Sequence, residues 1–152
     1  QNVHAYVMGE HGDSSFIPWS VANISNVPLA DCQKLIVNSE GVYPELNYDD
    51  IETYVRKSGA RVIERKGATF YAISVSVCHI IKCLLGGIDT TMTVSTMMHG
   101  EYGIDDVCLS VLSVVGREGA HGKILVPLTD DEIAKLRHSA DCLKDIIRQV
   151  EI

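Results

Sequence analysis

A histidine between two glycines is the side chain of this sequence best suited to chemistry. His11 stands in residues 9–15, Gly-Glu-His-Gly-Asp-Ser-Ser, at the end of an apolar run. Glycine adopts backbone angles that other residues avoid and lets the main chain approach a small ligand. An imidazole exchanges protons near neutral pH. Asp13 and Ser14 add the residue types of a hydrolase triad, but residues this close in one loop rarely orient around an imidazole. The segment predicts either a general acid–base or an exposed turn.

A second group of reactive side chains lies in an apolar stretch. Cys78, His79 and Cys83 fall within six residues, and His79 and Cys83 are one helical turn apart, a spacing that could begin a zinc site. Three ligands on one helix leave the coordination shell incomplete, and the neighbours are apolar. We therefore expect core packing here and no metal.

Composition narrows the class of protein. A chain of 152 residues fits one domain with its own core. The net charge of −7 argues against a nucleic-acid surface, and no apolar run reaches the roughly 18 residues that a membrane span requires. The five cysteines include no Cys-x-x-Cys pair, which favours buried, reduced thiols and a cytoplasmic location. These cysteines are Cys32, Cys78, Cys83, Cys108 and Cys142.

The elements next to the histidine segment must hold it in position. Alternating apolar residues predict a strand over 3–8 that ends at the His11 loop, followed by a second extended run over 16–24. From Pro28 to Pro44 we expect a connection that holds a short helix.

Two helical patterns follow and meet near Gly67. The first opens at Asp49 and Asp50, where acidic side chains suit the positive end of the helix dipole. The second ends at Gly86-Gly87. Either two helices meet at Gly67 or one long helix kinks there. The apolar stripes are Ile51, Tyr54, Val55 and Val62, then Phe70, Ile73, Val77, Ile80 and Leu84.

The last part of the chain predicts a meander and a helix. Alternating residues over 92–98 and 107–111, with a third run over 123–128, indicate antiparallel strands. Thr129 and Glu132 match a capping box, and an apolar stripe continues to Val150, which predicts a long amphipathic terminal helix facing the core. The order of elements is α+β, and the sequence contains no Gly-x-Gly-x-x-Gly phosphate loop.

Four segments together resemble one enzyme family. Residues 3–14 (Val-His-Ala-Tyr-Val-Met-Gly-Glu-His-Gly-Asp-Ser), continued by Pro-Trp-Ser at 18–20, resemble the active-site histidine segment of L-lactate dehydrogenases. Residues 64–73, 100–107 and 128–140 resemble, in the right order, the family's substrate-pocket helix, a hairpin and its last helix. The sequence is identified as a C-terminal domain of the lactate/malate dehydrogenase family. The resemblance implies an α+β domain over residues 1–152, with antiparallel strands, a long, kinked helix and a long C-terminal helix.

The resemblance also implies roles for four residues. His11 would be the proton donor and acceptor in the interconversion of pyruvate and L-lactate with NAD, a step of glycolysis and pyruvate fermentation. Thr69 would border the methyl side of the substrate, and Ile73 would pack against the nicotinamide ring. His4 aligns with a histidine of the anion site that binds fructose-1,6-bisphosphate at a subunit interface. A cytoplasmic homotetramer is the assembly that the family implies.

Other functions stay open on the sequence. Malate or another 2-hydroxyacid dehydrogenase shares the histidine loop, although Thr69 favours lactate. A non-catalytic oligomerisation module with the same fold is the alternative outside enzymes. The resemblance also implies an orienting aspartate, a substrate-clamping arginine and an NAD-binding Rossmann domain, which we expect to precede residue 1. We therefore expect residues 1–152 alone to be inactive and to self-associate.

Overall fold

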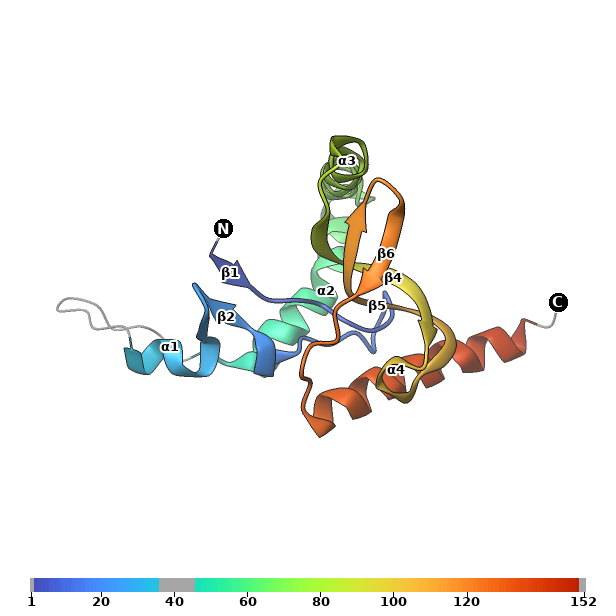
Figure 1. The fold of residues 1–152 in the computed structure, drawn as a ribbon. Coiled ribbons are helices and arrows are strands. Elements are labelled where there is room, and N and C mark those ends of the chain that lie inside the picture. The colour runs from blue at the N-terminus through green and yellow to red at the C-terminus, as the bar shows by residue number, and fades with distance from the viewer. Residues whose placement is uncertain (1, 36–45, 151–152) are drawn as a thin grey trace.

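The computed structural model describes residues 2–35 and 46–150. Figure 1 shows small and large antiparallel sheets with helices around them, which confirms the α+β expectation. The small sheet has the order β1-β2-β3: Val3–His4, Asn23–Ile24 and Val27–Pro28. The large sheet has the order β4-β5-β6: Thr90–His99, Asp105–Gly116 and Gly119–Lys123. The α-helices are α1 (Leu29–Leu35), α2 (Tyr48–Lys66), α3 (Tyr71–Gly86) and α4 (Asp130–Gln149).

The large sheet is the predicted meander, with its third strand displaced. β4 and β5 pair over most of their length, and their register shifts between Met97 and His99. The expected strand over 123–128 is wrong beyond Lys123, because the chain reverses tightly at Gly119, which has φ +89°, and pairs at once. The Ile124 N–H still donates to Leu112 O at 2.8 Å, and residues 125–128 then leave the sheet and lead to α4.

The N-terminal segment is less regular than its alternation predicted. The strand expected over 3–8 is reduced to β1 and an isolated bridge between Met8 and Phe16. The extended run over 16–24 is interrupted by a 3-10 turn, η1 (Trp19–Val21), which follows Pro18 and closes with the Ala22 N–H donating to Trp19 O. The short helix expected after Pro28 is α1, and residues 36–45 of that connection lie outside the described part.

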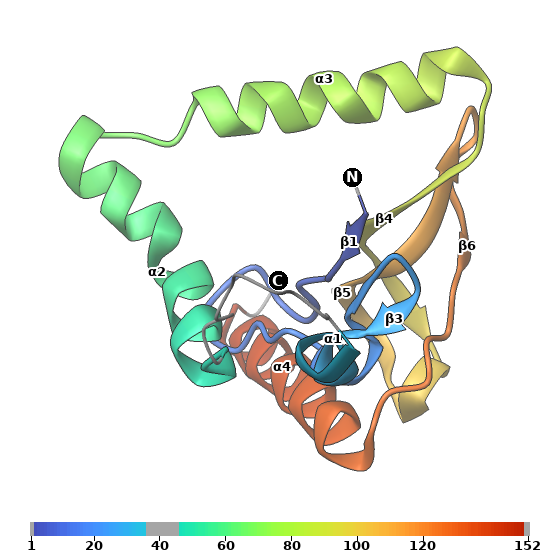
Figure 2. The same ribbon diagram turned by 90° about the vertical axis from the view of Figure 1, so that its left-hand side faces the viewer.

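The helical pattern around Gly67 forms two separate helices. Asn47 caps α2 by accepting a hydrogen bond from the Asp50 N–H. Gly67 ends the helix with φ +85°, a left-handed conformation that glycine adopts without steric cost. Figure 2 shows α3 turning away from α2 at this point and crossing to β4.

The core lies between the large sheet, α4 and the N-terminal segment. Thr129 and Glu132 form the predicted capping box, and the first half of α4 buries Leu136 and Ala140. The second half departs from expectation, because Ile147 is exposed. The other buried apolar side chains of this core are Met8, Phe16, Met98, Ile104, Val107, Leu109, Val111 and Leu112.

Two expectations about burial are wrong. Cys32 is buried, but Cys78 and Cys108 are exposed, and Cys83 and Cys142 are half-buried; all five are free thiols. The apolar stripes of α2 and α3 are also mostly exposed, since the remainder of the described chain does not cover them. Within residues 2–35 and 46–150, no helix has both the length and the hydropathy required to cross a bilayer.

Candidate active site

The loop that carries His11 is anchored at both ends by backbone hydrogen bonds. Met8 and Phe16 exchange two of them, at 2.9 and 3.0 Å, and close the loop like a hairpin. Gly9 exchanges two more with Ser110 of β5, at 3.0 and 2.8 Å. The large sheet therefore fixes the base of the loop.

Helix α4 holds the inner side of the loop through Ser139. The Ser139 hydroxyl accepts a hydrogen bond from the Glu10 N–H at 2.6 Å and lies 3.0 Å from Ser14 Oγ. A Cβ on Gly9 would lie 2.6 Å from Ser139 Oγ, so the close approach of loop and helix requires glycine there. Because Ser14 faces Ser139, its hydroxyl is engaged with α4 and the loop does not form a triad.

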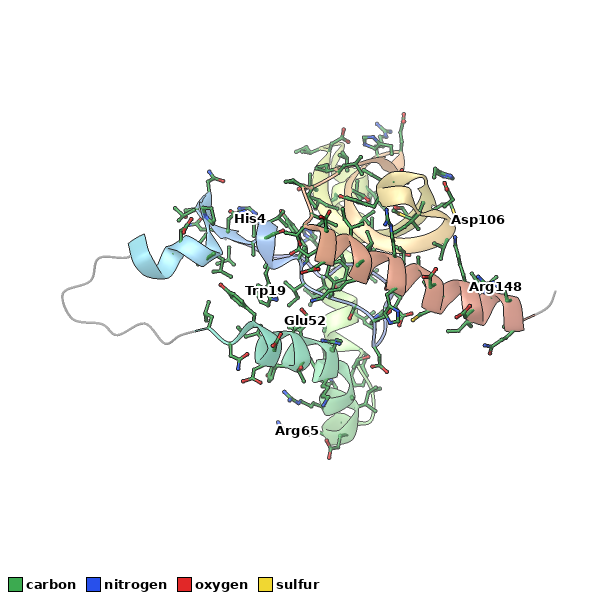
Figure 3. All side chains as sticks on the ribbon, turned by 90° about the horizontal axis from the view of Figure 1, so that it is seen from below. His4, Trp19, Glu52, Arg65, Asp106 and Arg148 are labelled. Atoms are coloured by element: carbon green, nitrogen blue, oxygen red, sulfur yellow. The ribbon has the colours of Figure 1, made fainter. Side chains whose placement is uncertain are left out.

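Helix α2 holds the outer side of the loop through an ion pair. Glu52 is buried, pairs with Arg56 at 2.9 Å and accepts from the Ile17 N–H at 3.4 Å. Arg56 in turn donates to the Asp13 carbonyl at 3.2 Å. Figure 3 shows Glu52 on α2 below the segment that carries Trp19, whose ring stacks on Tyr48 with centroids 4.6 Å apart.

These contacts present His11 at a cavity between the loop, α2 and the large sheet. The cavity has a volume of about 410 Å³, and the His11 side chain is exposed at it. An exposed imidazole on a loop held by three elements can give a proton to a bound ligand and take it back. The lining consists of Val7, Met8, Glu10, His11, Gly12, Asp13, Ser15, Val55, Arg56, Gly59, Thr93 and Ser110.

The other expected site residues do not line this cavity. Thr69 is half-buried in the α2–α3 connection, and Ile73 is 56% exposed on α3. His4 is exposed on β1, where it pairs with Asn23, and Figure 3 shows it beside the small sheet. Within the described chain, His11 is thus separate from the three residues that the resemblance placed around the substrate, cofactor and effector.

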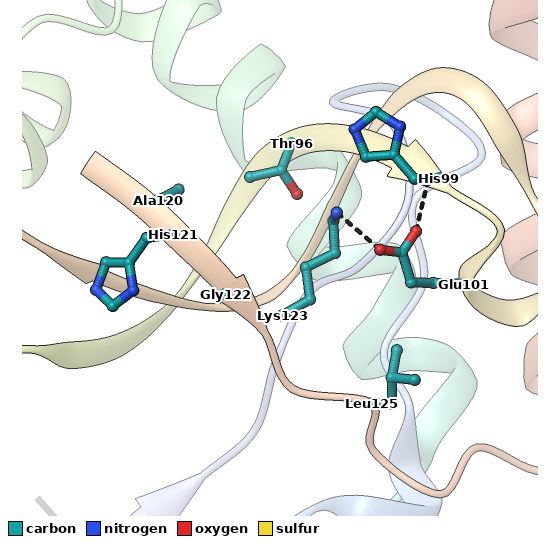
Figure 4. A pocket seen from close by; sticks show the side chains of 8 residues that line it. All are labelled: Thr96, His99, Glu101, Ala120, His121, Gly122, Lys123 and Leu125. Atoms are coloured by element: carbon teal, nitrogen blue, oxygen red, sulfur yellow. Dashed lines mark hydrogen bonds and ion pairs between the residues drawn. The ribbon is translucent and has the colours of Figure 1, made fainter. Parts of the chain in front are cut away.

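A second cavity, of about 470 Å³, lies along β4 and β6 (Figure 4). Glu101 accepts from Lys123 Nζ at 2.9 Å and from the His99 N–H at 2.6 Å. The His99 N–H, with Lys123, lowers the pKa of Glu101 to about 2. Since Glu101 neutralises the lysine, the cavity has little net charge with which to attract an ion.

The cysteines and histidine of α3 do not form a complete metal site. Cys83 Sγ lies 3.9 Å from His79 Nε2, and Cys78 is exposed. Across the residues that the structure describes, no group of three histidine, cysteine or acidic side chains is arranged to hold a metal ion.

The sequence did not indicate the residues that hold the loop. Ser139 could have been noticed, because a serine among Leu136, Ala140 and Leu143 is a polar residue on an otherwise apolar helix face. Glu52 and Arg56 have the i, i+4 spacing of an ordinary surface ion pair. Nothing local distinguishes them, since their partners are 35 and 43 residues away.

The chain resembles known proteins over its whole length. Residues 1–152 match the family model of the lactate/malate dehydrogenase, alpha/beta C-terminal domain. The L-lactate dehydrogenase of Thermoanaerobacterium saccharolyticum is 38% identical over all of this chain and 48% of its own length. That of Shouchella clausii is 41% identical over 99% of this chain and 45% of its own length. The chain spans about half the length of these relatives.

Solved structures agree with the sequence comparison. An L-lactate dehydrogenase from Clostridium thermocellum superposes with a TM-score of 0.85 at 36% identity, over 99% of this chain and 47% of that one. A malate dehydrogenase from Archaeoglobus fulgidus in complex with NADH gives a TM-score of 0.80 at 30% identity, over 99% and 45%. With a family model that matches every residue, this chain belongs to the lactate/malate dehydrogenase family and has the fold of its C-terminal domain.

Proposed function

We propose that residues 1–152 are the substrate-binding and catalytic domain of an L-lactate dehydrogenase, which interconverts L-lactate and pyruvate with NAD. The observation that carries the proposal is the exposed His11, lining a cavity on a loop that the large sheet, α2 and α4 hold in place. L-lactate dehydrogenases are also the relatives named above. The NAD-binding half of the enzyme would precede this domain.

His11 is proposed to move the proton of the reaction. In pyruvate reduction, the protonated imidazole would donate to the carbonyl oxygen as that oxygen becomes the hydroxyl of lactate. In lactate oxidation, the neutral imidazole would accept the hydroxyl proton. Thr69 is proposed to border the substrate methyl group.

Ile73 fits the nicotinamide end of NAD. Ile73 offers an exposed aliphatic side chain on α3, which suits the apolar face of a nicotinamide ring and would exclude water from it. NAD, when bound, supplies or accepts the hydride. A malate dehydrogenase neighbour with bound NADH supports the same cofactor.

The intact enzyme is further proposed to be a cytoplasmic homotetramer of glycolysis and pyruvate fermentation. The exposed apolar side chains of α3 supply surface that other parts of such an assembly would cover. His4, exposed on β1, is proposed to contact a phosphate of fructose-1,6-bisphosphate at a subunit interface.

The test uses the full-length enzyme, that is, residues 1–152 together with the NAD-binding half proposed to precede them. Pyruvate-dependent NADH oxidation is followed by absorbance, and the same assay with fructose-1,6-bisphosphate tests the regulatory role of His4. His11→Asn should lower kcat by about 10² to 10⁴-fold, because it removes a general acid–base. His138→Asn, an exposed histidine on α4, is the matched control and should retain activity.

Three results would contradict the proposal, each in a different way. Faster turnover of oxaloacetate than of pyruvate would indicate a malate dehydrogenase. Full activity of His11→Asn would leave the histidine without a catalytic role, as in a non-catalytic module. Robust pyruvate reduction by residues 1–152 alone would contradict the need for a second half.

A further inference from the structure

We propose that Ser139 of α4 is a positioning residue for His11, a role that rests on the proposed function of this loop. Ser139 is fully buried, with 0% of its surface exposed, and its hydroxyl contacts the loop on both sides of the histidine. Glu10 precedes His11 and Ser14 follows it three residues later. One hydroxyl therefore links the two arms of the loop to a rigid helix.

The hydrogen-bonding capacity of a hydroxyl matches these contacts. A serine hydroxyl has one donor hydrogen and two acceptor lone pairs. Ser139 Oγ accepts from the Glu10 N–H at 2.6 Å, and either serine can donate across the 3.0 Å between Ser14 Oγ and Ser139 Oγ. Replacing Ser139 with alanine would leave the Glu10 N–H without this acceptor next to the catalytic side chain.

Helix α4 is a firm support for this contact. Its first turn is closed by the capping box of Thr129 and Glu132. Glu132 also accepts from the Ser20 N–H at 3.0 Å, which ties the helix to the segment that follows the loop. Leu136 and Ala140 pack in the core on either side of Ser139 in the sequence. The position of the hydroxyl is therefore fixed by contacts other than its own hydrogen bonds to Glu10 and Ser14.

Ser139 and Arg56 both bind the loop, but in different ways. Arg56 reaches the outer side of the loop by a single bond to the Asp13 carbonyl, from a guanidinium that is exposed to solvent. The Ser139 bond to Glu10 is shorter, comes from a fully buried side chain, and lies on the residue adjacent to His11. We infer that Ser139 sets the direction in which the imidazole faces the substrate, since a displacement of about 1 Å can cost roughly 10²-fold in rate.

The test compares two buried serines in the full-length enzyme. Ser139→Ala should lower kcat for pyruvate reduction by about 10 to 100-fold, with a much smaller change in KM. Ser113→Ala is the matched control, because Ser113 is equally buried and donates a bond of 3.2 Å to Val111 O without touching the loop. Ser14→Ala removes one of the two contacts between Ser139 and the loop and should give an intermediate loss of kcat. It provides the test if Ser139→Ala folds poorly.

A second readout separates positioning from general stability. In enzyme labelled with [¹⁵N]histidine, the His11 ring signal is identified by its absence in His11→Asn. Ser139→Ala should shift that signal, whereas Ser113→Ala should not. Equal loss of kcat in both serine variants, or an unchanged His11 signal in Ser139→Ala, would overturn the inference. Lack of activity in the unmodified enzyme would instead contradict the proposed function, and the ring signal would still test the role of Ser139.

Discussion

Single polar side chains on α4 determine how the N-terminal segment lies against the core. Ser139 binds the His11 loop. The Glu132 carboxylate accepts hydrogen bonds from the N–H and the hydroxyl of Ser20, and also from the Thr129 N–H at the start of α4. Burial raises the pKa of Glu132, but the hydrogen bonds from Ser20 and Thr129 outweigh it, and the pKa is lowered. The ionised form of Glu132 is therefore the form that stabilises the fold.

This pKa shift predicts an acid-sensitive contact. Since the folded pKa is below the ordinary value of 4.5, the stabilisation by Glu132 is complete above pH 4.5 and is lost as the pH falls through the folded pKa. Glu132→Gln should lower the free energy of unfolding by about 1–3 kcal/mol at pH 7. The difference from the unmodified protein should shrink below pH 4.5, as measured by urea unfolding at several pH values. Glu118→Gln, in the exposed turn before β6, is the control, and an equal effect there would contradict the assignment.

At the scale of elements, Gly67 determines where α2 ends. The Gly67 N–H donates to Ile63 O at 2.7 Å from a left-handed backbone, so the last turn of α2 is satisfied and the chain changes direction. Gly59, in the same helix, has an ordinary helical conformation with no neighbouring atom within 4 Å of a Cβ. Gly67 therefore requires glycine for its backbone conformation, whereas position 59 can accept a side chain.

Alanine at these two positions should therefore act in opposite directions. Gly67→Ala should destabilise the chain by about 1 kcal/mol, because alanine is strained at φ +85°. Gly59→Ala should stabilise it by about 0.5–1 kcal/mol through the higher helix propensity of alanine. Thermal or urea unfolding of the two variants side by side measures both effects. A stabilised Gly67→Ala variant would show that α2 continues through this point.

At the scale of the whole molecule, most of α3 is left uncovered by the core. Figure 2 shows it along the top of the view, with α4 on the opposite side. Leu85 is 82% exposed and Val75 is 70% exposed. The exposed apolar residues on and next to this helix are Phe70, Tyr71, Ile73, Val75, Val77, Ile81, Leu85 and Ile88. Soluble monomers rarely expose so many contiguous apolar side chains, which indicates a surface for association.

Residues 1–152 alone should consequently self-associate through α3. Light scattering should give a mass above that of the 16.7 kDa chain and rising with concentration. Val75→Glu with Leu85→Glu should shift the mass toward the monomer, because it places charges in the apolar surface. Lys82→Glu is the matched control, since it changes the charge of the same helix and leaves its apolar side chains in place. A monomer at high concentration would contradict the prediction.

Local features of the fold could be determined from the sequence, because they depend on neighbours along the chain. The capping box of Thr129 and Glu132, the break at Gly67 and the alternation of β4 and β5 all involve contacts within a few residues or one repeating pattern. The His11 segment was found in the same way, by resemblance over a continuous stretch.

Only the tertiary structure decided which side chains meet across the chain and which apolar faces are covered. Ser139 and Glu10 are 129 residues apart, and neither has a local pattern that indicates the other. The apolar residues of α3 and α4 have the same helical spacing, yet those in the first half of α4 are buried and those of α3 are mostly exposed. Periodicity shows that a helix has an apolar face, whereas the packing of distant elements determines what covers it. The sequence thus identified the catalytic candidate His11, and the tertiary structure identified the residues that hold it.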